Sequence, residues 1–372
     1  MRSKRILMLA ISICLALILA VPVVLGCAAP TPSPTPSPSP SPSPSPSPSP
    51  TPSPSPSAEV FDWRMQCYLV SEQIEYKSLE RMAEKVKEMS GGRLNITTYP
   101  ADVLVADVEI FDAIASGMIE IAYFSPGYSM GMTPVAGIAY FGWGLRTGWD
   151  ESYVHFDLGL DEILREAYLE HNVYYLSTSI VGMPYGGLMS KVPINGLKDF
   201  EGLKVRTFPP FANIFAANGA SIVSVSGPEI YSALSTGMID ACTWGPPRSM
   251  QALNLQEVGD YYIYGSEGTP DIQCILANPQ ALDSLPPDLR AILELAARES
   301  SYDMEKQYQY GNKIATQFFK DEGITFLDFS DEDKVEMAKL SQEYWDEVAA
   351  TDEYTARALD VIYGYMAEVG YL

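Results

Sequence analysis

The chain has 372 residues and a formal net charge of −23 at pH 7. Residues 1–57 hold three of the 24 basic side chains and none of the 47 acids, so the other 315 residues carry a net charge of −26. A field of that sign repels phosphate and anionic lipid, which excludes nucleic-acid binding and a polybasic membrane contact. The 47% hydrophobic content is enough for packed cores, and 315 residues suit two domains.

The N-terminus has the layout of a secretory signal peptide. Three basic residues precede an apolar run at 6–25, so we expect residues 1–26 to be a signal peptide and the body to be extracytoplasmic. The next residues, Val24-Leu25-Gly26-Cys27, resemble the lipobox of bacterial lipoproteins. This predicts lipid attachment at Cys27 and anchoring to the cell membrane. The alternative is an uncleaved signal anchor, since the run is long enough to span a bilayer.

A proline-rich segment follows, and residues 27–57 are interpreted as the anchoring cysteine and a spacer. Every even position from 30 to 56 is proline, alternating mainly with serine and threonine. Proline at this density fixes φ and removes amide donors, which favours extended polyproline II over helix or sheet. At about 3.1 Å per residue the tract reaches about 80 Å. The alternative is a ligand for a proline-recognising domain.

The hydrophobic period then alternates between strand and helix. The patterns predict strands at 61–70, 93–99 and 119–124 and helices at 76–89 and 108–116. This βαβαβ order favours a mostly parallel sheet with helices on both faces. We therefore predict an α/β lobe 1 over residues 58–178.

A second stretch repeats part of the first. Residues 109–122, EIFDAIASGMIEIA, and residues 229–242, EIYSALSTGMIDAC, share six identities in fourteen positions. Each reads as a helix closed by a glycine, Gly117 or Gly237, that leads into an apolar strand. The repeat predicts a similar lobe 2 over residues 179–270, with a ligand at the carboxyl ends of the strands. The alternative is coincidence between two amphipathic helix-to-strand turns.

The remaining residues, 271–372, are predicted to return to lobe 1 as a crossover strand and to end in long bracing helices. The patterns indicate helices at 284–320, 330–350 and 352–369. Hinges between the lobes are expected at 177–181 and 271–278.

Several short motifs occur in the order found in a known family. They are Ser90-Gly91-Gly92-Arg93-Leu94, Gly186-Gly187, Ser190-Lys191-Val192-Pro193-Ile194, Gly202-Leu203-Lys204-Val205-Arg206, Glu229-Ile230-Tyr231-Ser232-Ala233-Leu234 and Gly237-Met238-Ile239-Asp240-Ala241. In this order they resemble the solute-binding proteins of tripartite ATP-independent periplasmic (TRAP) transporters, the DctP family. The resemblance covers nearly all of the chain after the spacer. Trp244-Gly245-Pro246-Pro247 resembles the branch that binds 2-oxo acids and other small monocarboxylates.

The resemblance implies a fold like the type II periplasmic-binding-protein fold, whose lobes close on an organic acid and deliver it to TRAP permease subunits. It also implies that Arg206 grips the carboxylate. The chemistry agrees, because a guanidinium has paired N–H donors that match a carboxylate and keeps its charge in a closed site. The alternative is a surface arginine paired with Glu201 or Asp199.

Further residues are candidates for the site. Trp244 directly follows the second repeated turn, which puts it near the cleft between the lobes, so it is expected to wall the ligand; the alternative is a core tryptophan. Tyr185 lies beside Gly186-Gly187, where the backbone allows close approach, so it is expected to contact the ligand; the alternative is a packed loop tyrosine. The resemblance also makes Glu267 a candidate for contact with the ligand, since it stands where the 2-oxo-acid branch can carry a metal-coordinating acid; the alternative is a solvated loop acid. The glutamine expected before the glycine pair is Pro184 here, which has no side-chain oxygen. We therefore expect no metal and no other cofactor.

Two other functions compete with this prediction. A solute-binding lipoprotein of an ATP-driven importer has a similar two-lobed architecture. An extracellular hydrolase that uses two carboxylates is compatible with a chain of 47 acids. A serine hydrolase is disfavoured, because neither His155 nor His171 follows a GxSxG elbow. We predict a binding protein and not an enzyme.

Overall fold

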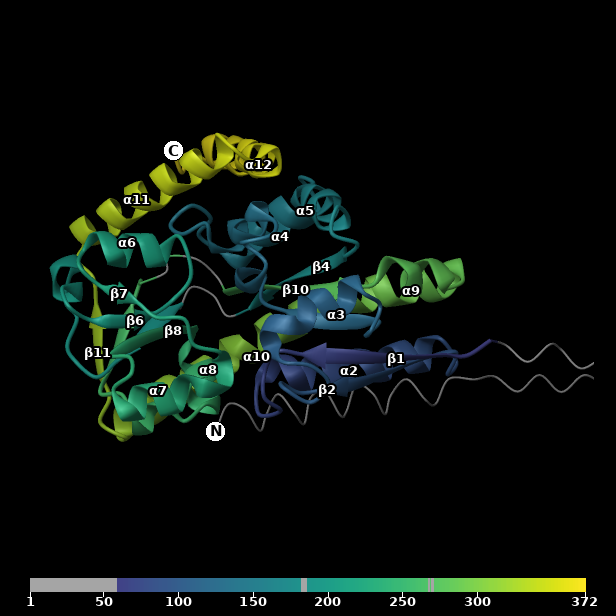
Figure 1. Cartoon of the computed structure of the whole chain (residues 1–372), viewed down its shortest axis with the longest axis horizontal. Helices are drawn as coiled ribbons and strands as arrows, with labels where there is room; N and C mark the ends of the chain where they lie inside the picture. Colours follow the sequence, from purple (N-terminus) through teal and green to yellow (C-terminus); the bar gives the residue numbers. More distant parts are fainter. Residues whose placement is uncertain (1–58, 182–185, 267, 269–270) are drawn as a thin grey trace, which may run out of the picture. The chain divides into compact units, whose positions relative to one another are not determined.

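The computed structural model describes residues 59–181, 186–266, 268 and 271–372. These residues belong to one compact unit, which contains two sheets (Figure 1). The predicted signal peptide, Cys27 and the proline-rich spacer lie outside the described residues. Within the described part, no helix is both long and apolar enough to cross a membrane.

The first sheet has the strand order β2-β1-β3-β10-β4. Its strands are β1 (Phe61–Cys67), β2 (Leu94–Tyr99), β3 (Ile121–Phe124), β4 (Tyr174–Val181) and β10 (Asp271–Ala277). β1 pairs in parallel with β2 and β3, whereas β10 runs antiparallel to both β3 and β4. The sheet is therefore mixed, and the expected mostly parallel arrangement holds for its first three strands only.

The helices of this part are α2 (Ile74–Met89), α3 (Ile110–Ala115), α4 (Gly148–Phe156), α5 (Leu160–Leu169) and α9 (Pro279–Ser284), with short 3-10 turns η1 (Asp107–Glu109), η2 (Pro126–Tyr128) and η3 (Pro134–Tyr140). α2 buries Leu79, Met82 and Val86 along one face, as their helical spacing predicts. It is followed by Gly91 at φ 63°, a conformation that glycine adopts without a Cβ clash. We call this sheet with these elements lobe 1.

The second sheet has the order β11-β9-β5-β8-β6-β7. Its strands are β5 (Gly187–Ser190), β6 (Lys204–Arg206), β7 (Ser221–Ile222), β8 (Ala241–Gly245), β9 (Tyr261–Tyr264) and β11 (Thr325–Asp328). The accompanying helices are α6 (Phe211–Ala217), α7 (Ile230–Thr236) and α8 (Pro247–Ala252), with η4 (Leu197–Phe200), η5 (Gly227–Glu229) and η6 (Leu255–Glu257). We call this sheet and these helices lobe 2. Its core includes the rings of Phe200 and Phe215, stacked 4.2 Å apart.

The repeated stretches adopt the same local structure in the two lobes. Gly117 and Gly237 follow α3 and α7 at φ 74° and 72°. The next residues, Met118 and Met238, are each 57% exposed, and the isoleucines after them are fully buried before β3 and β8 begin. The two short helices therefore enter equivalent strands of the two sheets.

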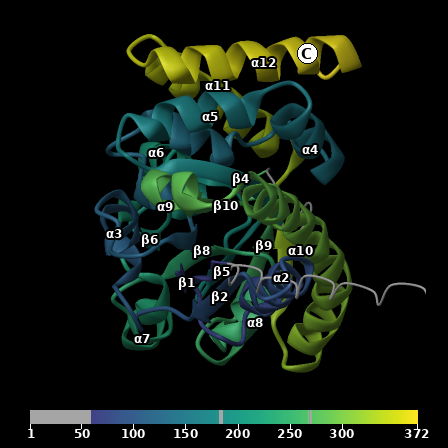
Figure 2. The same cartoon turned by 90° about the vertical axis from the view of Figure 1, so that its right-hand side faces the viewer.

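The C-terminal segment spans both lobes. It consists of α10 (Pro287–Asp321), β11, α11 (Asp331–Ala349) and α12 (Glu353–Val369). α10 packs on α2 and β4 of lobe 1 and on α8 of lobe 2, and α12 lies over α5 (Figure 2). The expected helix at 284–320 corresponds to α10, which begins at Pro287, a residue that favours a helix start, whereas the short α9 before it was not predicted. β11 was not predicted.

One buried ion cluster attaches α10 to α2. Asp303 accepts hydrogen bonds from Arg81 and Ser78 and pairs with Lys306. Burial tends to raise the pKa of Asp303, but the hydrogen bonds outweigh it and hold the pKa below its ordinary value. The carboxylate therefore stays ionised and joins α10 firmly to lobe 1.

The chain passes between the sheets after β4 and before β10. β4 remains paired with β10 as far as Val181, so the predicted lobe boundary after residue 178 lies inside this strand. The segments 177–181 and 271–277, where we expected hinges, pair with each other in the first sheet.

Candidate functional site

A small cavity of about 40 Å³ lies between the lobes, where several strands reach their carboxyl ends. Lobe 1 and β10 contribute Tyr68, Gln73, Glu75, Ser125, Tyr128 and Gln273, and lobe 2 contributes Arg206, Phe208, Thr243, Trp244 and Ser249. A buried water needs about 10–15 Å³ by this kind of measure, so the space corresponds to about three or four waters. A molecule enclosed here has only a few non-hydrogen atoms.

Arg206, the last residue of β6, is 3% exposed and fixed by two backbone carbonyls. Its Nε donates to Val225 O at 3.1 Å and its Nη1 to Thr243 O at 3.0 Å. Its Nη2 is buried and has no hydrogen-bond partner among the described residues. Arg206 is buried, and among the described residues it forms no ion pair with Glu201 or Asp199. The alternative of a surface arginine is therefore wrong. The site holds a positioned cation with an unused donor.

Two aromatic rings flank this cation. The guanidinium carbon lies 4.6 Å from the centre of the Phe208 ring and 5.2 Å from that of Trp244. Cation–π attraction favours these positions, and it strengthens where water is excluded. Trp244 also packs edge-on against Tyr68 of lobe 1 at 6.4 Å. The structure thus places Arg206 and Trp244 together in the wall of one cavity.

Hydrogen bonds close the lobes around the cavity. Asp107 of η1 accepts from Tyr128 Oη at 3.0 Å and from the backbone of Gly227, the first residue of η5, at 3.3 Å. Across the cavity, Gln73 Nε2 donates to Ser249 O at 3.2 Å. Burial raises the pKa of Tyr128, with the charge of Arg206 opposing, so the phenol remains a donor.

Sequence reasoning missed the lobe 1 wall. Gln73 and Glu75 lie at the start of α2, and Tyr128 follows β3. A signal was available, since the turn after the first strand of an α/β unit is a usual place for ligand contacts. Of the other predicted residues, Tyr185, Glu267 and Cys27 lie outside the described residues, as does Pro184.

Acidic side chains are sparse around the cavity. The described residues contain no cluster of three or more His, Cys, Asp and Glu side chains that could hold a metal. Glu75 is the one acid among the described residues that line the cavity, and it could supply at most two of the six to eight oxygen ligands that calcium takes.

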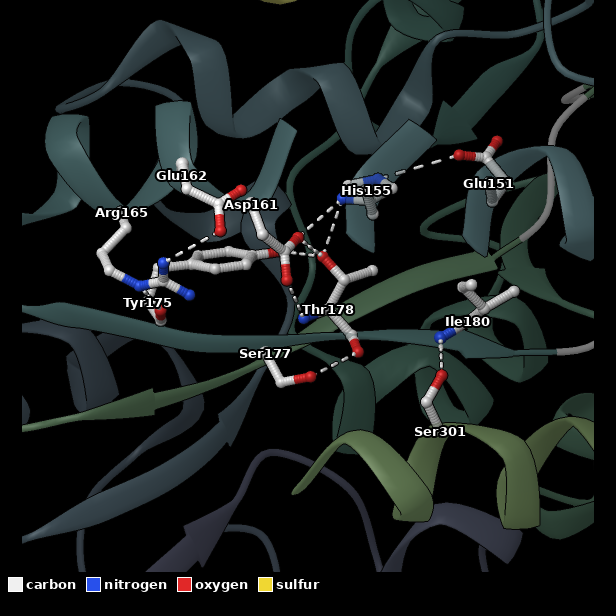
Figure 3. A network of polar contacts seen from close by, with 10 residues as sticks. All are labelled: Glu151, His155, Asp161, Glu162, Arg165, Tyr175, Ser177, Thr178, Ile180 and Ser301. Carbon is white, nitrogen blue, oxygen red and sulfur yellow. Dashed lines mark hydrogen bonds and ion pairs between the residues drawn. The ribbon is translucent and has the colours of Figure 1, made fainter. Parts of the chain in front are cut away.

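A second polar cluster lies behind β4, away from the cavity (Figure 3). His155 Nδ1 of α4 is 2.8 Å from Asp161 Oδ1 and 2.9 Å from Thr178 Oγ1, and Nε2 is 3.7 Å from Glu151 Oε2. In a catalytic triad the nucleophile and the acid use opposite ring nitrogens. Here both partners share Nδ1, and Thr178 is fully buried. The cluster therefore holds β4 against α4 and α5.

A family model described as bacterial extracellular solute-binding protein, family 7 (DctP), matches residues 67–352. The chain belongs to this family. Its members are the solute-binding proteins of TRAP transporters and not enzymes, and they work outside the cytoplasm.

The chain is also similar to individual proteins. It is 28% identical over 293 residues, 78% of this chain and 80% of the relative, to a monocarboxylate 2-oxoacid-binding periplasmic protein of Nostoc sp.. A TRAP solute-binding protein of Pseudoalteromonas atlantica with bound sodium and pyruvate superposes with a TM-score of 0.75, 26% identity, and coverage of 84% and 96% of the two chains. One from Bordetella bronchiseptica with calcium and picolinate gives 0.77 at 23% identity, covering 84% and 94%. The two-lobed fold is thereby confirmed.

Proposed function

We propose that this solute-binding protein captures a small organic acid anion, a 2-oxo acid or a related monocarboxylate, between its two lobes. The observation that carries the proposal is Arg206 Nη2, a buried cationic donor without a partner among the described residues, in the wall of the interlobe cavity. A buried donor left unpaired is costly, and a ligand carboxylate would satisfy it with a charge-assisted hydrogen bond.

The size and lining of the cavity support the same ligand class. About 40 Å³ suits an acid of few atoms, and Phe208 and Trp244 exclude water from its carboxylate. The relatives that bind pyruvate and other 2-oxo acids are consistent with this size. The family implies that the acid is delivered to TRAP permease subunits in the membrane.

Calorimetry on Arg206→Ala and Arg206→Lys tests the proposal with pyruvate, lactate, alanine and propionate as probes. Removing one partner of a buried charge pair costs about 2–5 kcal/mol, so affinity for the bound acid should fall about 30-fold to several thousand-fold in the alanine variant. The lysine variant should also bind poorly, because an ammonium lacks the planar fork. Wild-type affinity in Arg206→Ala would refute the assignment, and melting curves run beside the titrations show whether the variant is folded.

Anchoring by lipid on Cys27 is a separate part of the proposal. It rests on the lipobox-like residues 24–27 after an apolar run. Metabolic labelling with a fatty acid should mark the wild-type protein and leave Cys27→Ala unlabelled. Label that persists in the variant would contradict lipid attachment at Cys27.

A further inference from the structure

The elements that lead into the two repeated helices touch each other across the lobes. Asp107 is the first residue of η1, before α3, and Gly227 is the first residue of η5, before α7. The two residues are 120 positions apart, which is the offset between the repeats. The backbone N–H of Gly227 donates to Asp107 Oδ2 at 3.3 Å. The two lobes are therefore joined at equivalent positions, by a side chain from lobe 1 and a backbone amide from lobe 2.

Asp107 also holds a residue of the cavity wall. It is 2% exposed and does not itself line the cavity. The same Oδ2 accepts from Tyr128 Oη at 3.0 Å. The Tyr128 ring lines the cavity on the lobe 1 side and packs edge-on against Phe208 of lobe 2 at 5.4 Å. One carboxyl oxygen thus binds a phenol of lobe 1 and a backbone N–H of lobe 2.

Gly227 in turn supports the lobe 2 wall. A Cβ at this position would lie 2.3 Å from the Trp244 ring, so glycine allows the indole to pack directly on the backbone. Two residues earlier, Val225 O accepts from Arg206 Nε at 3.1 Å. The segment 225–227 therefore contacts both Arg206 and Trp244, while Asp107 holds it to lobe 1.

This contact is separate from the chain crossings that follow β4 and precede β10. Those two strands lie at one end of the first sheet, whereas η1 follows β2, the strand at the opposite edge. A hinge at the crossings would let η1 and η5 separate when the lobes open. Water would then satisfy the groups that Asp107 joins, so the contact favours the closed form over the open one.

Resting on the proposed function, we infer that Asp107 is a latch that holds the lobes closed over the bound acid and sets how long the acid stays bound. It acts through Gly227 and Tyr128 and is therefore a positioning residue. Because the latch forms only as the lobes close, it slows dissociation of the ligand and leaves association nearly unchanged.

Stopped-flow binding of pyruvate tests the inference. Asp107→Ala should raise the dissociation rate about 5-fold to 100-fold, since closure then buries an N–H and a hydroxyl group that have lost their acceptor. The association rate should stay within about threefold of wild type. Asp107→Asn should dissociate within about threefold of wild type, because its amide oxygen accepts the same two hydrogen bonds. Asp112→Ala is the matched control, since Asp112 is an exposed acid of the adjoining α3.

Hydrogen exchange at the Gly227 amide gives a readout that does not depend on ligand kinetics. In the protein saturated with pyruvate, this amide should exchange slowly in wild type and Asp107→Asn, and about fivefold or more faster in Asp107→Ala. Amides of β3 and β8 should keep their wild-type protection in all variants. Faster exchange throughout α3 and β3 in Asp107→Ala would make Asp107 a structural residue of lobe 1 and overturn the latch.

The remaining outcomes separate this inference from the proposed function. Wild-type dissociation or wild-type exchange at Gly227 in Asp107→Ala overturns the latch and leaves the carboxylate site intact. Dissociation from Asp107→Asn as fast as from Asp107→Ala also overturns it, because the acceptor oxygen would then be irrelevant. If pyruvate does not bind wild type, or Arg206→Ala binds it as wild type does, the proposed function fails instead.

Discussion

Gln66 in lobe 1 and Arg206 in lobe 2 occupy equivalent places in the two sheets. Gln66 of β1 pairs with Ala122 of β3, and Arg206 of β6 pairs with Cys242 of β8. Ala122 and Cys242 are the last residues of the two repeated stretches, 120 positions apart. The same scaffold position thus carries a neutral amide in one lobe and a cation in the other.

Both side chains hold the loop that leads to the repeated helix. Gln66 Nε2 donates to the carbonyls of Cys67 and Pro100, each at 2.8 Å, and its Oε1 accepts from Leu104 N at 3.0 Å. Arg206 holds the carbonyl of Val225 before η5 and keeps Nη2 unused. In lobe 1, the side chain of Gln66 serves only to hold the structure of that lobe. In lobe 2, the longer side chain of Arg206 also holds a loop, and its Nη2 remains available as a donor for a ligand.

Gln66→Ala tests the structural role of Gln66 in this comparison. It leaves one buried or partly buried amide and two carbonyls without their partner, and each such loss costs about 1–3 kcal/mol before water compensates. The low end of this range for three groups is about 3 kcal/mol, so we expect the free energy of unfolding, measured by urea denaturation, to fall by about 3 kcal/mol. Ligand affinity should stay within a factor of about three, because Gln66 does not line the cavity.

Arg206→Gln is the matched variant for that measurement, since it gives lobe 2 the side chain of lobe 1. It should lose ligand affinity and lose less stability than Gln66→Ala does. If Gln66→Ala and Arg206→Gln changed ligand affinity and stability equally, the two positions would not differ in role.

Local sequence patterns predicted α2 and the two repeated helix-to-strand turns well. The spacing of Leu79, Met82 and Val86 and the glycines after α3 and α7 act within a few residues, so the sequence alone indicates them. The antiparallel β10 and the short β11 depend on pairing with strands far away in the chain, which periodicity does not encode. Proline at positions 286 and 287 was read as the start of one helix, although it also closes the helix before it.

The same difference between local and long-range contacts explains which residues of the site could be predicted. Arg206 and Trp244 lie in one lobe, beside the repeat and inside recognisable motifs, so they could be predicted. Glu75 lies more than a hundred residues earlier and reaches the cavity only because the lobes close around it. Acidic residues are common in the first turn of a helix, where they interact favourably with the helix dipole. The sequence therefore does not distinguish Glu75 from such a residue. The tertiary contact decides its role.

Glu151 gives lobe 1 a pH response near neutrality. Burial raises its pKa to about 7, with His155 opposing and Asp150 reinforcing the shift. The folded state therefore keeps a proton that the unfolded state releases above its ordinary pKa of 4.5. Stability from this group is present at low pH and is lost as pH rises toward and through about 7. Melting temperatures from about pH 5 to pH 8 should fall for this reason.

Glu151→Gln isolates that contribution, because the amide is neutral at every pH. The variant should match wild type near pH 5 and become the more stable protein near pH 8. Curves that stay parallel across the range would show that Glu151 is already ionised in the folded protein.

The smallest expected effect concerns the acids near the ends of the two repeats, Glu120 and Asp240. Glu120 accepts from the backbone of Arg64 in β1 at 2.8 Å, and Asp240 accepts from that of Lys204 in β6 at 2.9 Å. The charged partners differ, since the Arg64 guanidinium lies 2.7 Å from Glu120 while Lys204 Nζ is 3.9 Å from Asp240. Glu120→Gln should therefore lower stability more than Asp240→Asn, though by no more than about 1 kcal/mol, because solvent screens both pairs.

Acid should remove that difference. Burial tends to raise the pKa of Glu120, but hydrogen bonds and the charge from Arg64 outweigh it, so the folded pKa lies below the ordinary value. Stability from this carboxylate is then present above the ordinary pKa and is lost as pH falls through the lowered one. Denaturation of both variants at about pH 7 and pH 3 measures this. The gap between them should narrow as pH falls through the lowered pKa of Glu120 and should also shrink in high salt. A gap that persists in acid would mean that the amide disturbs packing in lobe 1, and that the two repeats differ here in shape and not in charge.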